Sequence, residues 1–203
     1  MHGVASSKAD DETKELWYAL LVRRRFERRV ERQLSNKGYE TFLPTYVSKR
    51  QCTDRLKLLS LPLFPTHVFC RFDLHHRLPI LMTPGVNCIL GVGRLAQAID
   101  ETEITAIQRL IESGLSLEPA SYVPAGESVR VEEGPLKGVV GIISTVNGTS
   151  RLIVSVRLLM RSISVEIDSA SVRPIQTYSK TLPNVHRIPE DKDRSLSYIP
   201  RHH

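Results

Sequence analysis

The stretch Trp17-Tyr18-Ala19-Leu20-Leu21-Val22-Arg23-Arg24-Arg25-Phe26-Glu27 decides the fold of the first half of the chain. Its first part belongs to a continuous apolar and aromatic run over 16–22, which predicts a buried central strand. Its second part opens a basic segment over 24–37, in which apolar residues recur every four positions and form one helical stripe. Gly38 is a suitable end for that helix. A strand that runs directly into an amphipathic helix predicts a domain with mixed strands and helices.

Further elements of both kinds follow in the first half of the chain. Strand composition returns at 39–47, at 67–73 and at 86–90. A second long helix is predicted to begin at Asp100, because its side chain suits the N-cap and a glutamate stands three residues later. Gly114 is predicted to end this helix.

The second half of the chain has a different pattern, which starts with Val129-Arg130-Val131-Glu132-Glu133-Gly134-Pro135-Leu136-Lys137-Gly138-Val139-Val140-Gly141. Short strand-like runs recur there, and Asn147-Gly148 between two of them is a strong hairpin signal. The runs cover 128–132, 138–146, 151–158, 162–167 and 171–174. Short strands in such close succession predict a small closed barrel.

These patterns together predict an α+β protein with two domains. Pro119 and the lack of any hydrophobic period mark the segment between the two patterns as a linker. The polar ends of the chain are predicted to be disordered. The expected division is a disordered segment at 1–13, an N-terminal domain at 14–114, a linker at 115–123, a barrel at 124–176 and a disordered tail at 177–203.

Composition narrows the class of protein. The net charge is +6 and the pI about 9.4, which favours contact with phosphate backbones or acidic protein faces. No apolar run approaches the roughly 18 residues of a membrane helix, and no hydrophobic signal core is present, so we expect a cytoplasmic protein without membrane contact. The three cysteines form no C-x-x-C pair, which favours reduced thiols over a disulfide framework.

The sequence offers little for catalysis or for a metal. His67 and Cys70 stand three apart on a predicted strand, so they point to opposite faces and do not converge with His75 and His76 on a metal. The glycine-rich stretches lack a phosphate-binding loop signature, and no serine lies in a G-x-S-x-G elbow. We therefore expect no enzyme activity, no cofactor and no metal.

The two quoted stretches, in this order, resemble the NusG family of transcription elongation factors. The resemblance implies an N-terminal NGN domain, an α/β sandwich with an antiparallel sheet that binds RNA polymerase. It also implies a C-terminal KOW domain, a small SH3-like β-barrel that recruits a partner. The segment Tyr39-Glu40-Thr41-Phe42-Leu43-Pro44-Thr45-Tyr46 resembles that of specialised branches such as RfaH, LoaP and UpxY, which act as antiterminators on selected operons.

The resemblance also implies how the NGN domain docks on the clamp helices of RNA polymerase. Phe64 and Pro65 match an aromatic-proline-glycine-aromatic pattern that borders the docking cavity of the family, whereas Thr66 and His67 replace its usual Gly-Tyr. By residue physics alone this segment is a rigid turn that enters a strand. The residues expected to bind polymerase are Trp17, Tyr18, Phe64, Pro65, Phe69 and Pro84.

Arginines gather at the start of the first predicted helix and allow two interpretations. They either form a solvated face with i,i+4 ion pairs or hold a nucleic-acid backbone, and the arginine fork suits phosphate. Arg25, Arg29 and Arg32 are expected to share one helical face. The resemblance implies contact with non-template or upstream DNA, also from a loop near residue 75. The expected nucleic-acid contacts are Arg23, Arg24, Arg25, Arg28, Arg29, Arg32, His75, His76 and Arg77.

The last expected contact lies between two strands of the barrel. Its residues are apolar for a barrel surface, which favours a protein contact: Leu158, Leu159, Met160 and Arg161. In NusG the equivalent loop has an aromatic-glycine pair that meets Rho or a ribosomal protein, and Leu159-Met160 replaces that pair here, which argues against Rho.

The predicted function is therefore that of a monomeric, noncatalytic elongation factor or antiterminator. The alternative is a ribosome-associated RNA-binding protein that uses the KOW barrel, since ribosomal proteins carry this motif too. That alternative leaves the N-terminal half of the chain unexplained.

Overall fold

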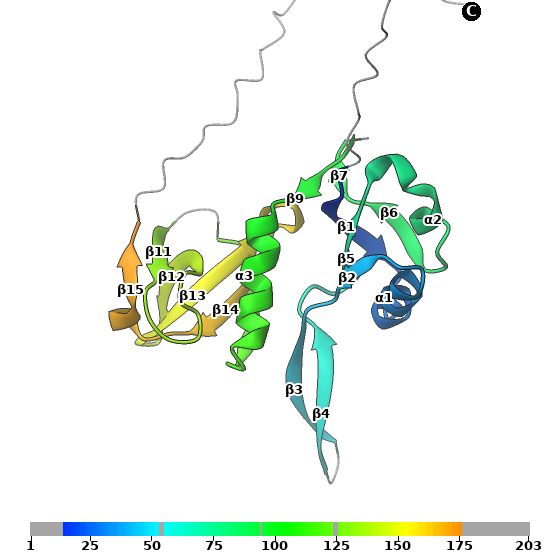
Figure 1. Ribbon diagram of the computed structural model, residues 1–203. Coiled ribbons are helices and arrows are strands. Elements are labelled where there is room, and N and C mark those ends of the chain that lie inside the picture. The colour runs from blue at the N-terminus through cyan, green and yellow to red at the C-terminus, as the bar shows by residue number, and fades with distance from the viewer. Residues whose placement is uncertain (1–13, 53–54, 94, 124–125, 176–203) are drawn as a thin grey trace, which may run out of the picture.

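An antiparallel sheet forms the centre of the N-terminal region (Figure 1). The computed structural model describes residues 14–52, 55–93, 95–123 and 126–175. The strand order is β2-β5-β1-β6, and β9 also pairs with β1. The predicted central strand is confirmed, because β1 has neighbours on both sides. These strands are β1 (Leu16–Val22), β2 (Glu40–Phe42), β5 (His67–Phe72), β6 (Val86–Ile89) and β9 (Ala98–Ile99).

Two helices cover one face of this sheet. The helices α1 (Glu27–Asn36) and α2 (Leu78–Leu81) bury Val30, Leu34 and Ile80 against it. The predicted stripe is therefore confirmed. The predicted start of α1 at Arg24 is wrong, because Arg25 adopts a φ of 68°, which lies outside the right-handed helical region.

Two short hairpins leave the N-terminal sheet. One is made of β3 (Thr45–Cys52) and β4 (Arg55–Pro62) and projects away from the body of the molecule (Figure 1). The other is made of β7 (Gly91–Val92) and β8 (Leu95–Ala96). A short 3-10 turn, η1 (Leu74–His76), leads from β5 towards α2.

The C-terminal region is a six-stranded antiparallel sheet in the order β10-β14-β13-β12-β11-β15. Asn147 and Gly148 turn between β12 and β13 with positive φ, as the sequence predicted. The strands are β10 (Leu117–Ser121), β11 (Glu127–Val131), β12 (Val140–Val146), β13 (Thr149–Val156), β14 (Arg161–Glu166) and β15 (Val172–Pro174), with 3-10 turns η2 (Arg157–Leu159) and η3 (Ser169–Ser171). The mixed α+β fold is confirmed.

The predicted linker is wrong over Leu117–Ser121, because these residues form β10 and pair with β14. Pro119 misled the prediction: β10 is an edge strand, and an edge can accommodate a residue without a backbone N–H. The tails predicted to be disordered, 1–13 and 177–203, lie outside the described residues.

The apolar residues form two clusters, one on each face of the N-terminal sheet. Tyr18 and Leu20 belong to the cluster under α1 and α2. Trp17 and Ala19 belong to the other, which continues through α3 (Glu101–Glu112) into the C-terminal sheet. Figure 1 shows α3 between the two sheets. The core is therefore not divided at residues 115–123, where the sequence predicted a linker. Among the described residues, no helix is long and apolar enough to cross a membrane.

Candidate protein-docking and nucleic-acid interfaces

Three of the residues expected to bind polymerase lie together on one face of the N-terminal sheet. Successive residues of a strand point to opposite faces, so Trp17 lies on the face towards α3 while Tyr18 lies under α1. Phe69 shares the face of Trp17, and its ring meets that of Phe64 edge-on at 5.7 Å. The ring of Phe42 is 6.0 Å from Phe69. Trp17, Phe64 and Phe69, with Phe42, form what we call the aromatic face.

A tight turn presents Phe64 to this face. The His67 N–H donates to the Phe64 carbonyl over 3.2 Å, Pro65 stands at the second position of the turn, and Thr66 at the third has a φ of 67°. Turns of this kind favour proline and then glycine at these two positions. The family pattern of proline followed by glycine thus has a geometric reason. Thr66 stands where the pattern has glycine, and its side chain makes this positive φ a strained backbone conformation.

Glu27 holds this turn against α1. Its buried carboxylate accepts a 2.9 Å hydrogen bond from the Thr66 N–H, and the Val22 N–H donates to the Thr66 carbonyl over 2.8 Å. The role of Glu27 was not predicted from the sequence. The sequence feature that could have indicated this role is a single acidic residue among five nearby arginines. Glu27 is buried, so it does not serve to neutralise those arginines at the surface.

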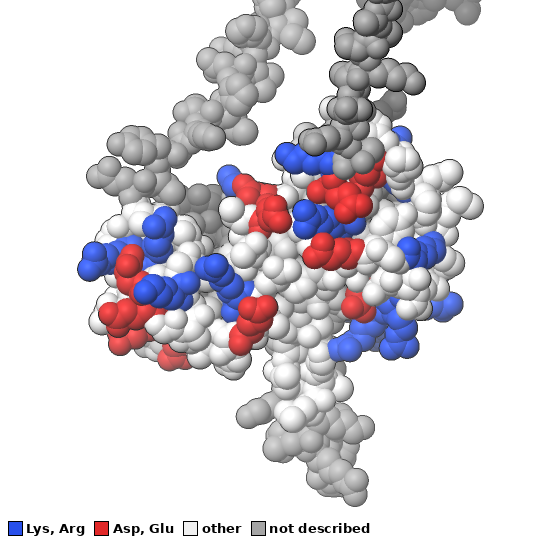
Figure 2. Space-filling model, viewed as in Figure 1, with Lys and Arg blue, Asp and Glu red and all other residues white. Residues whose placement is uncertain are grey.

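The arginines form a basic surface over α1, which Figure 2 shows as a cluster of blue side chains. Arg23 and Arg29 lie over the ring of Phe26, at 4.9 and 5.6 Å from its centroid. Arg28 donates to the Ser60 hydroxyl over 2.6 Å and so joins α1 to β4. All six arginines are exposed: Arg23, Arg24, Arg25, Arg28, Arg29 and Arg32.

The structure does not bear out the common helical face predicted for Arg25, Arg29 and Arg32. Arg25 precedes α1 in the left-handed turn, so only Arg29 and Arg32 belong to the helix. Arg24, Arg25 and Arg32 have no hydrogen bond or ion pair among the described residues, and they are the freest members of this basic surface.

Pro84 lies away from the aromatic face, in a turn that packs on α1. The next residue, Gly85, has a φ of 103°, and a Cβ there would lie 2.9 Å from Phe26 and 3.0 Å from Val30. The Arg23 N–H donates to the Gly85 carbonyl over 2.8 Å. Pro84 and Tyr18 therefore belong to the side of the sheet that α1 covers.

His75, His76 and Arg77 are exposed at and after η1. Asp73 contacts the two histidines: its carboxylate accepts a hydrogen bond from the His75 N–H over 3.0 Å and one from His76 Nδ1 over 2.6 Å. These hydrogen bonds, the one from His75 first, hold the pKa of Asp73 below its usual value despite its burial. The backbone of His75 and the ring of His76 are therefore held at the surface, next to the start of α2.

The expected partner loop of the C-terminal sheet faces the N-terminal sheet. Leu158 and Leu159 pack against the cluster that contains the aromatic face, whereas Met160 is 62% exposed. Arg161 lies close enough to His67 to lower its pKa, although burial contributes more to that shift.

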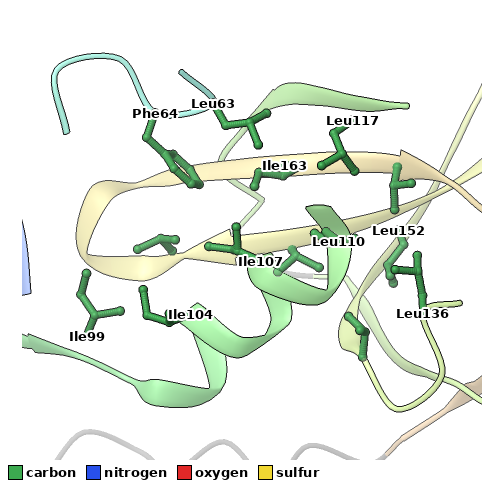
Figure 3. Close-up of a cluster of buried hydrophobic side chains, with 14 of the residues drawn as sticks. Leu63, Phe64, Ile99, Ile104, Ile107, Leu110, Leu117, Leu136, Leu152 and Ile163 are labelled. Atoms are coloured by element: carbon green, nitrogen blue, oxygen red, sulfur yellow. The ribbon is translucent and has the colours of Figure 1, made fainter. Parts of the chain in front are cut away.

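The aromatic face itself is covered. Trp17, Phe64 and Phe69 are 4%, 1% and 0% exposed. Figure 3 shows Phe64 beside the strand of the C-terminal sheet that carries Ile163, and Ile107 of α3 belongs to the same cluster. Arg157 donates from Nε to Oε1 of Glu103 over 2.8 Å and thereby ties α3 to the C-terminal sheet.

The sequence of this chain is similar to those of proteins that carry the name NusG. Residues 15–108 match the NusG family model, described as transcription termination factor nusG. The transcription termination/antitermination protein NusG of Helicobacter pylori is 25% identical over 177 residues, covering 78% of this chain and 98% of that protein. The protein of the same name from Pseudomonas aeruginosa is 28% identical over 117 residues, covering 55% of this chain and 66% of that protein. A solved structure, "Domain interaction in Thermotoga maritima NusG", covers 80% of this chain and 98% of that chain at 18% identity and a TM-score of 0.48.

Proposed function

This chain is a NusG-like factor, and on that premise we propose that it regulates transcription elongation by docking on RNA polymerase, without catalysing a reaction. It suppresses pausing or termination while it is bound. The names of its relatives in Helicobacter pylori and Pseudomonas aeruginosa support the role in transcription.

The aromatic face carries the proposal. Trp17, Phe64 and Phe69 are contiguous on one side of the sheet, and the hydrogen bond that Thr66 donates to Glu27 fixes the turn that presents Phe64. A few aromatic anchors on a rigid support are what a protein needs to bind an exposed pair of helices. We propose that the clamp helices of RNA polymerase are that partner. Since the C-terminal sheet covers this face, polymerase reaches it only after the sheet moves away.

The basic surface over α1 holds DNA beside the polymerase in this proposal. Phe26 supports Arg23 and Arg29 in fixed positions, while Arg24, Arg25 and Arg32 are free to meet phosphates. An arginine fork binds phosphate through two parallel hydrogen bonds. The non-template strand or the upstream duplex is the DNA in reach of such a surface, with His75, His76 and Arg77 as further contacts.

The C-terminal sheet recruits a second protein through the loop Leu158–Arg161. Met160 is already exposed there, and Leu158 and Leu159 become available when the sheet leaves the aromatic face. We propose a ribosomal protein as this partner before Rho, because no aromatic residue stands in the loop. We also propose that the chain is a specialised factor for selected operons.

Two measurements on the full-length chain test this function. Affinity-tagged chain from a lysate should recover RNA polymerase subunits, whereas recovery of ribosomal RNA with its proteins would favour the ribosome-associated alternative. In reconstituted elongation complexes, saturating chain should shorten pauses at a defined site. Unchanged pause lifetimes with the chain demonstrably bound would refute the proposed effect on elongation.

A further inference from the structure

A pocket of about 370 Å³ is formed by residues that follow α3 and by two turns of the C-terminal sheet. Leu115 follows α3, Leu136 lies on the loop between β11 and β12 (Figure 3), and Ile167 follows β14. These residues lie outside the aromatic face, the basic surface and the partner loop. The function proposed above therefore gives this pocket no role.

The floor of the pocket is apolar. Leu136 and Val131 are 2% and 1% exposed and Ile167 is half-buried, whereas Leu115 is 40% exposed at the edge of the floor. An aliphatic side chain placed here removes apolar surface of Leu115 from water, which favours binding. The floor therefore fits one or two aliphatic side chains.

The rim of the pocket is acidic. Glu133, Glu166 and Asp168 are exposed, and within the described part of the chain none of the three forms an ion pair. Arg151 stands opposite Glu166 on β13, but its guanidinium donates to Glu118. A segment that suits this pocket therefore carries a cation beside its aliphatic residues.

The chain itself has such a segment after its last described residue. The sequence Val185-His186-Arg187-Ile188 has two aliphatic side chains and an arginine within four positions. No aspartate or glutamate occurs in the sequence between positions 176 and 189, so every charged residue of this stretch is basic. Pro183-Asn184, directly before the segment, favours a turn. We call residues 185–188 the docking segment.

The docking segment is close enough along the chain to return to the pocket. Ser171 lines the pocket, and the Ile175 N–H donates to the Ser128 carbonyl over 2.8 Å. Ile175 is four positions after Ser171, so their Cα atoms lie at most about 14 Å apart. The ten residues from Ile175 to Val185 can span about 33 Å. A connection this short gives an effective concentration in the millimolar range, so weak contacts are sufficient for docking.

We propose that the docking segment binds in this pocket of the same chain. Its aliphatic residues pack on the apolar floor, and Arg187 pairs with Glu133 and Glu166 at the rim. An arginine guanidinium suits this rim, because its planar donors bond carboxylates with defined geometry. The inference is independent of the proposed function, since it needs neither polymerase nor DNA.

Limited trypsin digestion of the full-length chain tests the docking. Trypsin cleaves after Arg187, inside the docking segment, and after Arg194, which lies outside it. The initial rates of the two cleavages are measured by mass spectrometry, and their ratio is compared between wild type and Glu133→Gln/Glu166→Gln. The matched control is Glu15→Gln/Glu127→Gln, which neutralises two exposed carboxylates outside the pocket. Circular dichroism checks that each variant is folded.

Release of the segment should raise the rate after Arg187 relative to that after Arg194. Proteolysis follows the population of the open form, so a segment docked four-fifths of the time should show a rise of about fivefold in the pocket variant. The control variant should keep the wild-type ratio. An unchanged ratio in the folded pocket variant, or an equal rise in the control, would overturn the proposal.

Photocrosslinking shows where the docking segment lies. Benzoylphenylalanine replaces Val185 in the full-length chain, and the proposal predicts a crosslink within one chain to the loop 133–136 or the turn 166–168. Tyr198 is the control position, because the acidic pair Glu190-Asp191 separates it from the docking segment, and its crosslink to the pocket should be much weaker. Crosslinks between two chains would assign the pocket to a second copy. That result, a crosslink to the pocket from position 198 alone, or none from either position would overturn the proposal.

Discussion

The buried carboxylate of Glu27 accepts a 2.9 Å hydrogen bond from the backbone N–H of Thr66. This contact joins the first turn of α1 to the turn before β5, so the basic surface and the aromatic face are built on one rigid connection. A second hydrogen bond to the same residue runs from the Val22 N–H to the Thr66 carbonyl. The position of Phe64 therefore depends on the start of α1, although Glu27 and Thr66 are 39 positions apart in the sequence.

Replacing Thr66 by glycine should stabilise the protein. Thr66 has a φ of 67°, a conformation that is unfavourable for a β-branched residue. Relief of this strain should exceed the extra entropy of glycine in the unfolded chain, with a net gain of about 1 kcal/mol. Urea unfolding measures it. The matched control is Asn147→Gly, because asparagine tolerates its φ of 51° well and should gain little. Equal gains at the two positions would contradict the assignment of strain to Thr66.

Alanine at Gly85 should destabilise the protein more than alanine at Gly38. Gly85 has a φ of 103° and Gly38 a φ of 90°, so alanine introduces the same kind of backbone strain at both positions. Only the Cβ at Gly85 would meet side chains, those of Phe26 and Val30, whereas nothing lies within 4 Å of the Cβ at Gly38. Crowding of a packed site costs about 1–3 kcal/mol, which is the expected difference. Thermal unfolding of the two variants checks it, and an equal loss would show that the turn does not press on α1.

Acidification should weaken the native state partly through His67. Burial, opposed by the hydrogen bond to the Pro65 carbonyl, lowers the pKa of His67, and Arg161 lowers it further. A lowered pKa means that the unfolded chain takes up the proton first, so this contribution to stability is present above pH 6.5 and is lost as the pH falls below it. The free energy of unfolding should therefore fall between pH 7 and about 5.5. The loss should be smaller in His67→Gln, and an unchanged loss would contradict this role of His67.

Charge reversal on the basic surface should weaken DNA binding without unfolding the protein. Arg24, Arg25 and Arg32 are exposed, and the structure gives them no hydrogen bond or ion pair within its described residues. The triple change to glutamate should lower the slope of log affinity against log salt by about 2–3, because each phosphate contact releases counterions. The assay is binding to bubble DNA at several salt concentrations. The control changes Arg130, Lys137 and Arg173, three exposed basic residues of the C-terminal region, to glutamate. Equal effects in both variants would return the α1 arginines to a solubilising role.

Local sequence patterns were sufficient for the elements whose contacts are local. The apolar run 16–22 became β1, and the stripe with Val30 and Leu34 became the buried side of α1. Asn147-Gly148 became a hairpin because that dipeptide suits two successive positive φ angles.

The features that the sequence did not predict depend on distant partners. Leu117–Ser121 is a strand because β14 offers it an edge, and Pro119 alone suggests the opposite. Glu27 matters only because the Thr66 N–H lies next to it. The shared core is another such feature. Ile104 and Ile107 of α3 indicate a buried helical face, but not that the C-terminal sheet would cover it together with Trp17 and Phe64.

Photocrosslinking from two exposed prolines tests the docking account most directly. Pro65 borders the aromatic face, whereas Pro84 lies in the turn on the α1 side of the sheet. Each is replaced in turn by benzoylphenylalanine in the full-length chain, which is bound to RNA polymerase and irradiated. The account predicts a crosslink from position 65 to the clamp helices of the polymerase and a much weaker one from position 84. Crosslinking from position 84 with none from position 65, in complexes that co-elute, would contradict it.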